Sequence, residues 1–414
     1  MAYAANMKAL LTAFKETVCG HFAGVGGLIA GLIVAWQLNV FQIVPWAIAI
    51  YPTVLTAKAI INGMFSGRLN TALHIGTISP RFSGNMKTLG RMLQRVLALT
   101  LATAVAMSIV SAVLGSLFLG VGARSFLDIL VIVVATMSLG LTTYLFTLPV
   151  TFTAFKRGLD LDGVAYPIAA TIADALITAW YALTVNIYFK FGDIGKYAIV
   201  LIAILPMVLT LYSLRRRIYK GGFSKTIKTS ILALMFVAVI ASFTGVILQK
   251  MIMQKTNVLA NIWSGNHALY LSAVIAAYPA MIELVGDAAL VIGSTATTGL
   301  VLGLLEPNFS AVKNHAPQII GAWAASAVVF VPLSAASLLL TGKFALPVFS
   351  LMTSMLLMTN AFAMIAMILI SYSFAILTFK KGLDPDHLVV PLESSLAGAI
   401  TSTALLVALF LLLH

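Results

Sequence analysis

The chain has 414 residues, of which 61% are hydrophobic and only 9% are charged, and its mean hydropathy is +1.05. A soluble core does not need so much apolar surface, and many windows reach the roughly 20 apolar residues that span a bilayer. The net charge of +13 would suggest nucleic acid in a soluble protein, but here it indicates membrane topology and no nucleic-acid partner.

Hydropathy predicts an all-α polytopic membrane protein with about eleven transmembrane helices. A short lead covers residues 1–17. The spans follow at about 19–41, 44–66, 92–120, 126–154, 167–189, 196–214, 229–250, 268–293, 317–341, 346–377 and 390–413. The chain therefore lies mostly within a lipid bilayer.

Two pairs of matching stretches indicate an internal duplication. Tyr51–Pro80 (YPTVLTAKAIINGMFSGRLNTALHIGTISP) matches Tyr278–Pro307 at its tyrosines, prolines, and several Thr, Leu and Gly positions. The stretch KRGLDLDGVAYP at 156–167 likewise matches KKGLDPDHLVVP at 380–391. The sequence therefore predicts a first repeat at 1–195, a linker helix with a basic loop at 196–228, and a second repeat at 229–414.

The odd number of spans predicts how the two repeats are oriented. Each repeat contributes five helices, and the additional span at 196–214 returns the second repeat to the orientation of the first. The result is a parallel pseudo-dimer, expected to be monomeric. With a cytoplasmic N-terminus, most Lys and Arg residues of the loops fall inside, which predicts a multi-pass plasma-membrane protein whose C-terminus is outside.

Three acidic residues fall inside apolar segments. Glu283 and Asp287 lie one helical turn apart and share a face, whereas the first repeat has Thr56 and Ile60 at these positions. Asp174 lies about 10 Å into its helix, and Asp287 lies about 9 Å from the end of its own. Acids in hydrocarbon are costly, so we expect Asp174, Asp287 and Glu283 to bind or relay a cation.

The simpler interpretation of these acids is an internal ion pair, for which Lys58 is the lysine within a span. Lys58 could tether an acid and hold the pathway shut, or it could extend toward an interface. The sequence leaves both roles open. One lysine cannot neutralise three acids, so a cation-binding role for the remaining carboxylates stays the expectation.

Other polar residues are candidates for the pathway or its mouths. Small polar residues favour helices interrupted near Asn62 to Gly67 and near Gly286 to Thr297, with Asn62, Ser66, Gly286 and Ser294 facing protein or water. Glycine is also common where membrane helices pack together, which is the alternative interpretation. Asp160 and Asp384 either cap the helices that follow them or form an acidic mouth, and the two roles are compatible. Glu393 is expected near the inner mouth.

This pattern resembles the membrane domain of MgtE-type magnesium channels and their two-repeat solute-carrier relatives, in the form without cytosolic regulatory domains. Residues Pro52, Lys58, Arg68, Leu69, Thr71 and Gly76 follow one family motif, as Gly286, Ser294 and Thr298 do in the second half. A second motif is followed by Gly158, Leu159, Asp160, Pro167, Thr171 and Asp174. The resemblance implies that the second and fifth helices of each repeat line a pore, and that Asp174 is the aspartate that recognises magnesium. Gly398 stands where the second half should carry that aspartate.

The expected function is therefore transport of a divalent cation, Mg²⁺ first, through a pathway at the repeat interface. Mg²⁺ usually keeps several waters, which suits a wide site with few carboxylates. The alternative is a proton- or sodium-coupled carrier of another metal or of a small organic solute. An enzyme is not expected, because no metalloprotease, nucleophile or nucleotide motif is present, and no organic cofactor is implied.

Overall fold

The computed structural model describes residues 2–21, 24–81, 86–159, 161, 165–215, 223–253, 267–381 and 385–413. Within these ranges, all of the regular secondary structure is helical. Eight of the helices are long and apolar enough to cross a membrane, and three shorter apolar stretches lie at Gly24–Trp36, Met235–Lys250 and Leu396–Leu412. The predicted class, an all-α polytopic membrane protein, is confirmed.

The predicted first span, 19–41, is wrong as a single helix. The chain there forms α1 (Ala2–His21), α2 (Gly24–Trp36) and α3 (Leu38–Ile43). At 1.5 Å per residue, the 13 residues of α2 extend about 20 Å, which is less than the roughly 30 Å of a hydrocarbon core. Hydropathy identified this segment as apolar but did not predict where its helices end.

The predicted interruptions of the second and eighth spans are also wrong. Helix α4 runs unbroken through Pro45–His74, and α12 runs unbroken through His267–Val301. Gly286 lies at a packing contact instead, since a Cβ placed on it would be in ordinary contact with Ala397 of a neighbouring helix. The observed interruption lies at Leu141–Thr143, a 3₁₀ turn inside the fourth predicted span.

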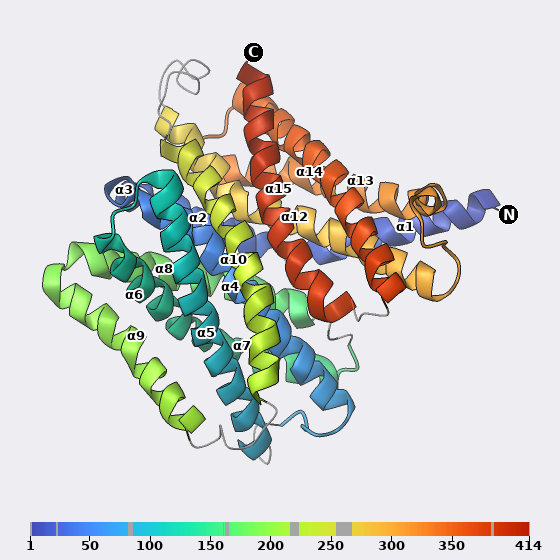
Figure 1. Cartoon of the computed structure of the whole chain (residues 1–414). Helices are drawn as coiled ribbons and strands as arrows, with labels where there is room; N and C mark the ends of the chain where they lie inside the picture. Colours follow the sequence, from blue (N-terminus) through green and yellow to red (C-terminus); the bar gives the residue numbers. More distant parts are fainter. Residues whose placement is uncertain are drawn as a thin grey trace. The chain divides into compact units, whose positions relative to one another are not determined.

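The helices group into two compact units, each described here by itself (Figure 1). Unit 2 covers Gln37–Gln249 and contains α3, α4, α5 (Met86–Leu119), α6 (Arg124–Gly140), η1 (Leu141–Thr143), α7 (Tyr144–Lys156), α8 (Tyr166–Lys190), α9 (Gly192–Arg215) and nearly all of α10 (Phe223–Met253). Unit 1 covers Met1–Trp36 and Lys250–His414 and contains α1, α2, α12, η3 (Phe309–Ala311), α13 (Val312–Leu340), α14 (Leu346–Lys381) and α15 (Pro385–Leu413).

These units do not follow the boundaries of the predicted repeats, because each unit contains an early helix of the other repeat. In unit 2, Gly245 of α10 lies against the backbone carbonyl of Ala49 in α4. In unit 1, Gly31 of α2 lies in the same way against the carbonyl of Ala276 in α12. Ala49 and Ala276 each lie two residues before a matched tyrosine, so the two glycines contact matching positions of the predicted repeats. Among the described residues, an early helix of each predicted repeat thus lies in the unit that holds the later helices of the other predicted repeat, an arrangement we call the exchange of first helices.

A methyl group at either glycine should force these helix pairs apart. A Cβ at Gly245 would overlap the Ala49 carbonyl, so we expect Gly245→Ala to lower the free energy of unfolding by about 1–3 kcal/mol. Gly90→Ala in α5 is the matched control, because a Cβ at Gly90 meets no atom and alanine favours the helix. Unfolding of both variants in mixed micelles measures the difference, and equal stabilities would contradict the close approach.

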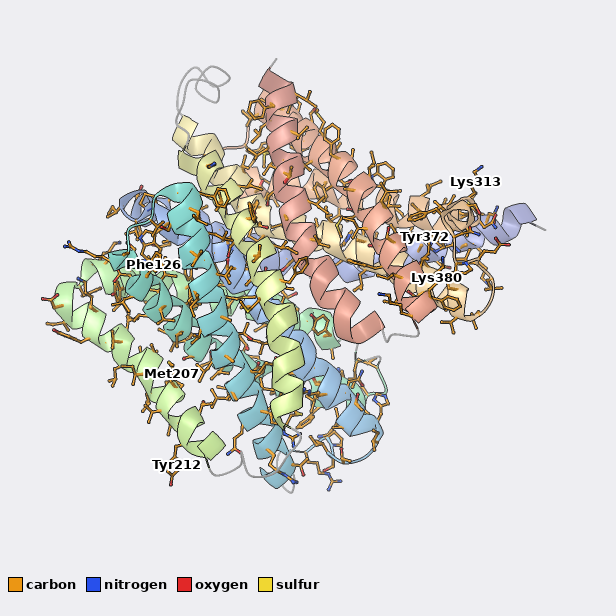
Figure 2. All side chains as sticks on the ribbon, in the orientation of Figure 1. Phe126, Met207, Tyr212, Lys313, Tyr372 and Lys380 are labelled. Carbon is orange, nitrogen blue, oxygen red and sulfur yellow. The ribbon has the colours of Figure 1, made fainter. Side chains whose placement is uncertain are left out.

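Helix α9 shows how the molecule presents itself to lipid. Its buried residues form a narrow stripe of Ile199, Ala203 and Thr210, and only 17% of its span is buried. Figure 2 shows Tyr212 of this helix pointing away from the rest of unit 2. This exposed apolar face is typical of a helix in contact with a bilayer. Helix α9 corresponds to the predicted linker span.

Candidate functional site

Helices α4 and α8 pack antiparallel and form the polar centre of unit 2. The Tyr181 hydroxyl of α8 donates to the carbonyl oxygen of Ala47, near the start of α4. Further along, the hydroxyls of Tyr51 and Thr178 lie 3.1 Å apart. Near the other end of the interface, Gly63 faces the Tyr166 hydroxyl. The register of the two helices is therefore fixed along most of α8.

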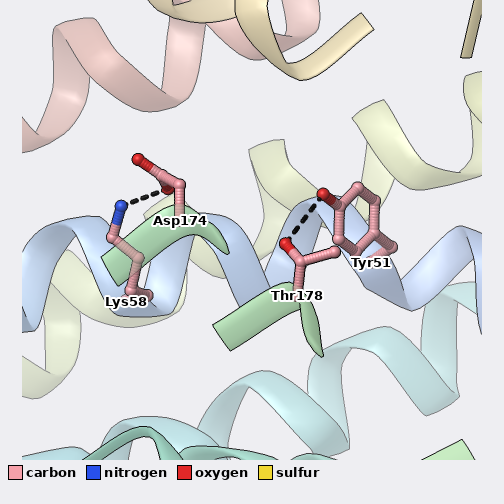
Figure 3. Close-up of polar contacts among 4 residues, drawn as sticks. All are labelled: Tyr51, Lys58, Asp174 and Thr178. Atoms are coloured by element: carbon pink, nitrogen blue, oxygen red, sulfur yellow. Dashed lines mark hydrogen bonds and ion pairs between the residues drawn. The ribbon is translucent and has the colours of Figure 1, made fainter. Parts of the chain in front are cut away.

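The central contact of this register is an ion pair between Lys58 of α4 and Asp174 of α8 (Figure 3). The Lys58 ammonium donates to Oδ1 of Asp174, the contact drawn as a dashed line in Figure 3. The residues are 6% and 5% exposed. Of the two roles left open for Lys58, the structure shows the tether to an acid.

This pair is one of several polar levels that follow one another along α4 and α8, about one helical turn apart. Tyr51 and Thr178 form the level on one side of the pair, and Figure 3 shows both contacts bridging the same two helices. On the other side, one turn away, are Asn62, which is buried on α4, and Thr171, which is half-buried on α8. Ser66, half-buried, follows one turn after Asn62. Polar and charged side chains thus follow one another along this helix interface over several turns.

Unit 1 has a matching contact between a tyrosine and a second hydroxyl, but it has no charged pair at the matching positions. The hydroxyls of Tyr278 and Ser402 lie 2.6 Å apart, matching Tyr51 and Thr178 in the repeats. Where the first repeat has Lys58 and Asp174, the second has Val285 and Gly398. Gly286 and Ala397 bring α12 and α15 close together at this level. The same scaffold thus carries a charged level in one unit and an uncharged level in the other.

Glu283 and Asp287 both lie on α12 in unit 1 and are half-buried. Oε2 of Glu283 lies beside Gly27 of α2, since a Cβ there would be 2.6 Å from this oxygen. Nearby, Nε2 of His21 lies 3.0 Å from the carbonyl oxygen of Leu284. The exchanged helix α2 therefore packs on the face of α12 that carries Glu283.

The other predicted site residues are distributed as follows. Gly286 is half-buried, and Ser294 and Thr298 are exposed on α12. Glu393 belongs to α15, but its side chain lies outside the described part, and Asp160 and Asp384 lie outside the described residues altogether. In the described ranges, no cluster of three or more His, Cys, Asp or Glu residues could hold a metal ion.

Sequence reasoning missed the hydroxyl partners of the two tyrosines. Tyr51 and Tyr278 are matching positions of the predicted repeats, but the sequence predicts no contact for their hydroxyls. Thr178 and Ser402 could have been found, because extending the second repeated motif toward the C-terminus aligns them. Equivalent tyrosines and equivalent hydroxyls would then have predicted the contact between the second and fifth helices.

Comparison with known protein families identifies the segment that holds these contacts. Residues 51–184 match the MgtE family, whose description is divalent cation transporter. This segment is similar to that family, and we refer to it as the MgtE domain. The domain begins at Tyr51 and includes Lys58, Asp174 and Thr178, so both contacts of Figure 3 lie within it. No solved structure matches the chain.

The match confirms the resemblance for residues 51–184, which are similar to a family of divalent cation transporters. It is a family of transporters rather than of enzymes. The matched range covers α4 to α8, which is the part of unit 2 that carries the buried ion pair. For residues 229–414, the resemblance stays a prediction that rests on the repeat.

Proposed function

We propose that this protein transports Mg²⁺ across the plasma membrane and that Asp174 is the carboxylate that the ion contacts. The observation that carries this proposal is the position of Asp174. It is a buried carboxylate on a membrane-spanning helix inside the MgtE domain, facing the polar side chains of α4. Intramembrane carboxylates mark ion pathways by default, because keeping one there is costly.

Mg²⁺ fits the sparse ligand set better than most ions do. It dehydrates reluctantly and is usually held by one or two carboxylates while it keeps several waters. Asp174 would supply direct or water-mediated contact, and Asn62 and Thr171 lie within a helical turn of the pair on their own helices. We propose Glu283 and Asp287 as additional carboxylates of a pathway between the repeats of a monomeric pseudo-dimer.

The membrane potential can drive entry. An inside-negative potential contributes about 2.3 kcal/mol per charge per 100 mV, hence roughly double for a divalent ion. The N-terminus is proposed to be cytoplasmic and the C-terminus outside, following the distribution of basic residues. In this orientation, the start of α8 with Thr171 is nearer the cytoplasm than Thr178 is.

The proposal is tested by Mg²⁺ entry into proteoliposomes under an imposed inside-negative potential, with protein-free liposomes as the control. We expect Mg²⁺ entry that exceeds the control. Flux without a Na⁺ or H⁺ gradient would indicate a channel-like pathway, whereas flux only with such a gradient would indicate an exchanger. Absence of divalent flux under both conditions would contradict the proposal and favour the carrier of an organic solute.

A further inference from the structure

We propose that Lys58 is a built-in competitor of the transported cation, whose ammonium occupies the carboxylate of Asp174 whenever no metal ion is bound there. This inference rests on the proposed function of Asp174. It adds a residue that sets the affinity of the site and the ease of release. Lys58 is thus a positioning residue that acts on the ion through Asp174.

The first argument is occupancy. The Lys58 ammonium contacts Oδ1 of Asp174 directly, and both residues are almost completely buried. A divalent ion or its hydrating water needs the same oxygen lone pairs that this ammonium uses. Mg²⁺ can share the carboxylate only if the ammonium withdraws or tolerates a nearby double positive charge. Binding of the ion and the lysine contact therefore oppose each other.

The second argument is the net charge at the position of the Lys58–Asp174 pair, compared with the matching position in unit 1. In unit 2, one ammonium and one carboxylate give a net charge of zero. The matching positions in unit 1 are Val285 and Gly398, which carry no charge. Neither repeat supplies a second carboxylate at this position to outweigh the lysine. Without Lys58 the carboxylate would attract a divalent ion unopposed, so the lysine must lower the affinity.

The third argument concerns the stability of the site when no ion is bound. A buried carboxylate without a counter-charge costs several kcal/mol, so an empty site would be unstable or would attract water and protons. Lys58 provides the counter-charge from a flexible four-carbon stem, which can swing as a point charge when the ion arrives. A transport site must bind its ion weakly enough to release it. Exchange of one cation for another on a single carboxylate meets this requirement.

The test compares Mg²⁺ affinity of the purified full chain with that of three single variants. Thermal unfolding is followed during titration with MgCl₂, at ionic strength held constant with choline chloride. We expect half-saturation at a Mg²⁺ concentration at least tenfold lower for Lys58→Gln than for wild type. Lys58→Arg should shift it at least threefold higher, because a guanidinium grips the carboxylate in a bidentate fork. Lys196→Gln, at an exposed lysine of α9 in the same unit, should leave it unchanged.

The two variants make the proposal falsifiable even if one is too unstable to purify. Unchanged or weaker Mg²⁺ affinity in Lys58→Gln, or unchanged or tighter affinity in Lys58→Arg, would overturn it. These results are separable from failure of the proposed function. If wild-type protein transports Mg²⁺ while the Lys58 variants bind it as wild type does, the competitor role fails and the transport function stands.

Discussion

Replacing Asp174 by asparagine is expected to reduce Mg²⁺ flux in proteoliposomes to the level of protein-free liposomes. Asparagine keeps the shape of the side chain and a carbonyl oxygen that accepts from Lys58. It removes the negative charge, however, and leaves the buried ammonium of Lys58 to repel the ion. At about 5 Å and an effective dielectric constant of about 20, this repulsion is about 3 kcal/mol per unit charge and doubles for a divalent ion.

The matched control for this prediction is Asp193→Asn. Asp193 lies in the first turn of α9 in the same unit and is exposed, so its substitution removes the same charge from the protein away from the α4–α8 interface. We expect its Mg²⁺ flux to equal that of wild type. If Asp174→Asn also transports Mg²⁺ at the wild-type rate while folding normally, Asp174 is not part of the pathway.

The sequence was sufficient to predict the helices and the position of the acid. Hydropathy located nearly all the apolar helices, and the distance from Pro167 placed Asp174 about 10 Å into the fifth helix. The partner of Asp174 could not be settled, because it depends on the register of α4 against α8. That register follows from Tyr51, Gly63, Tyr166 and Thr178, whose contacts are tertiary. The two roles of Lys58 therefore remained open.

The reciprocal exchange of first helices lay beyond the sequence for a related reason. An apolar helix is compatible with many neighbours, and hydropathy does not say which one it packs against. Gly31 and Gly245 allow backbone contact with Ala276 and Ala49, yet glycine at a membrane helix interface is common. For the same reason, the sequence did not decide whether Gly286 belongs to a helix break or to a packing contact. Small residues indicate close approach as readily as interruption.

A double-mutant cycle on the ion pair should separate its contribution to stability from its contribution to transport. We expect Lys58→Met and Asp174→Leu each to lower the free energy of unfolding by about 3–5 kcal/mol in the absence of divalent ions, because each leaves a buried charge without its counter-charge. The double variant, with two apolar side chains of similar length, should recover most of this loss. Titration with SDS in mixed micelles measures all four proteins.

The double variant is also the sharper test of what the charges are for. A buried ion pair is weak evidence for a stabilising role, since apolar residues of similar volume often replace one without loss. If the double variant is as stable as wild type and carries no Mg²⁺, the charges are retained for the ion rather than for the fold. Single variants that lose less than about 1 kcal/mol would contradict the burial of the pair, because exposed pairs contribute only that much. Addition of Mg²⁺ should restore stability to Lys58→Met, where the ion can take the place of the ammonium, and not to Asp174→Leu.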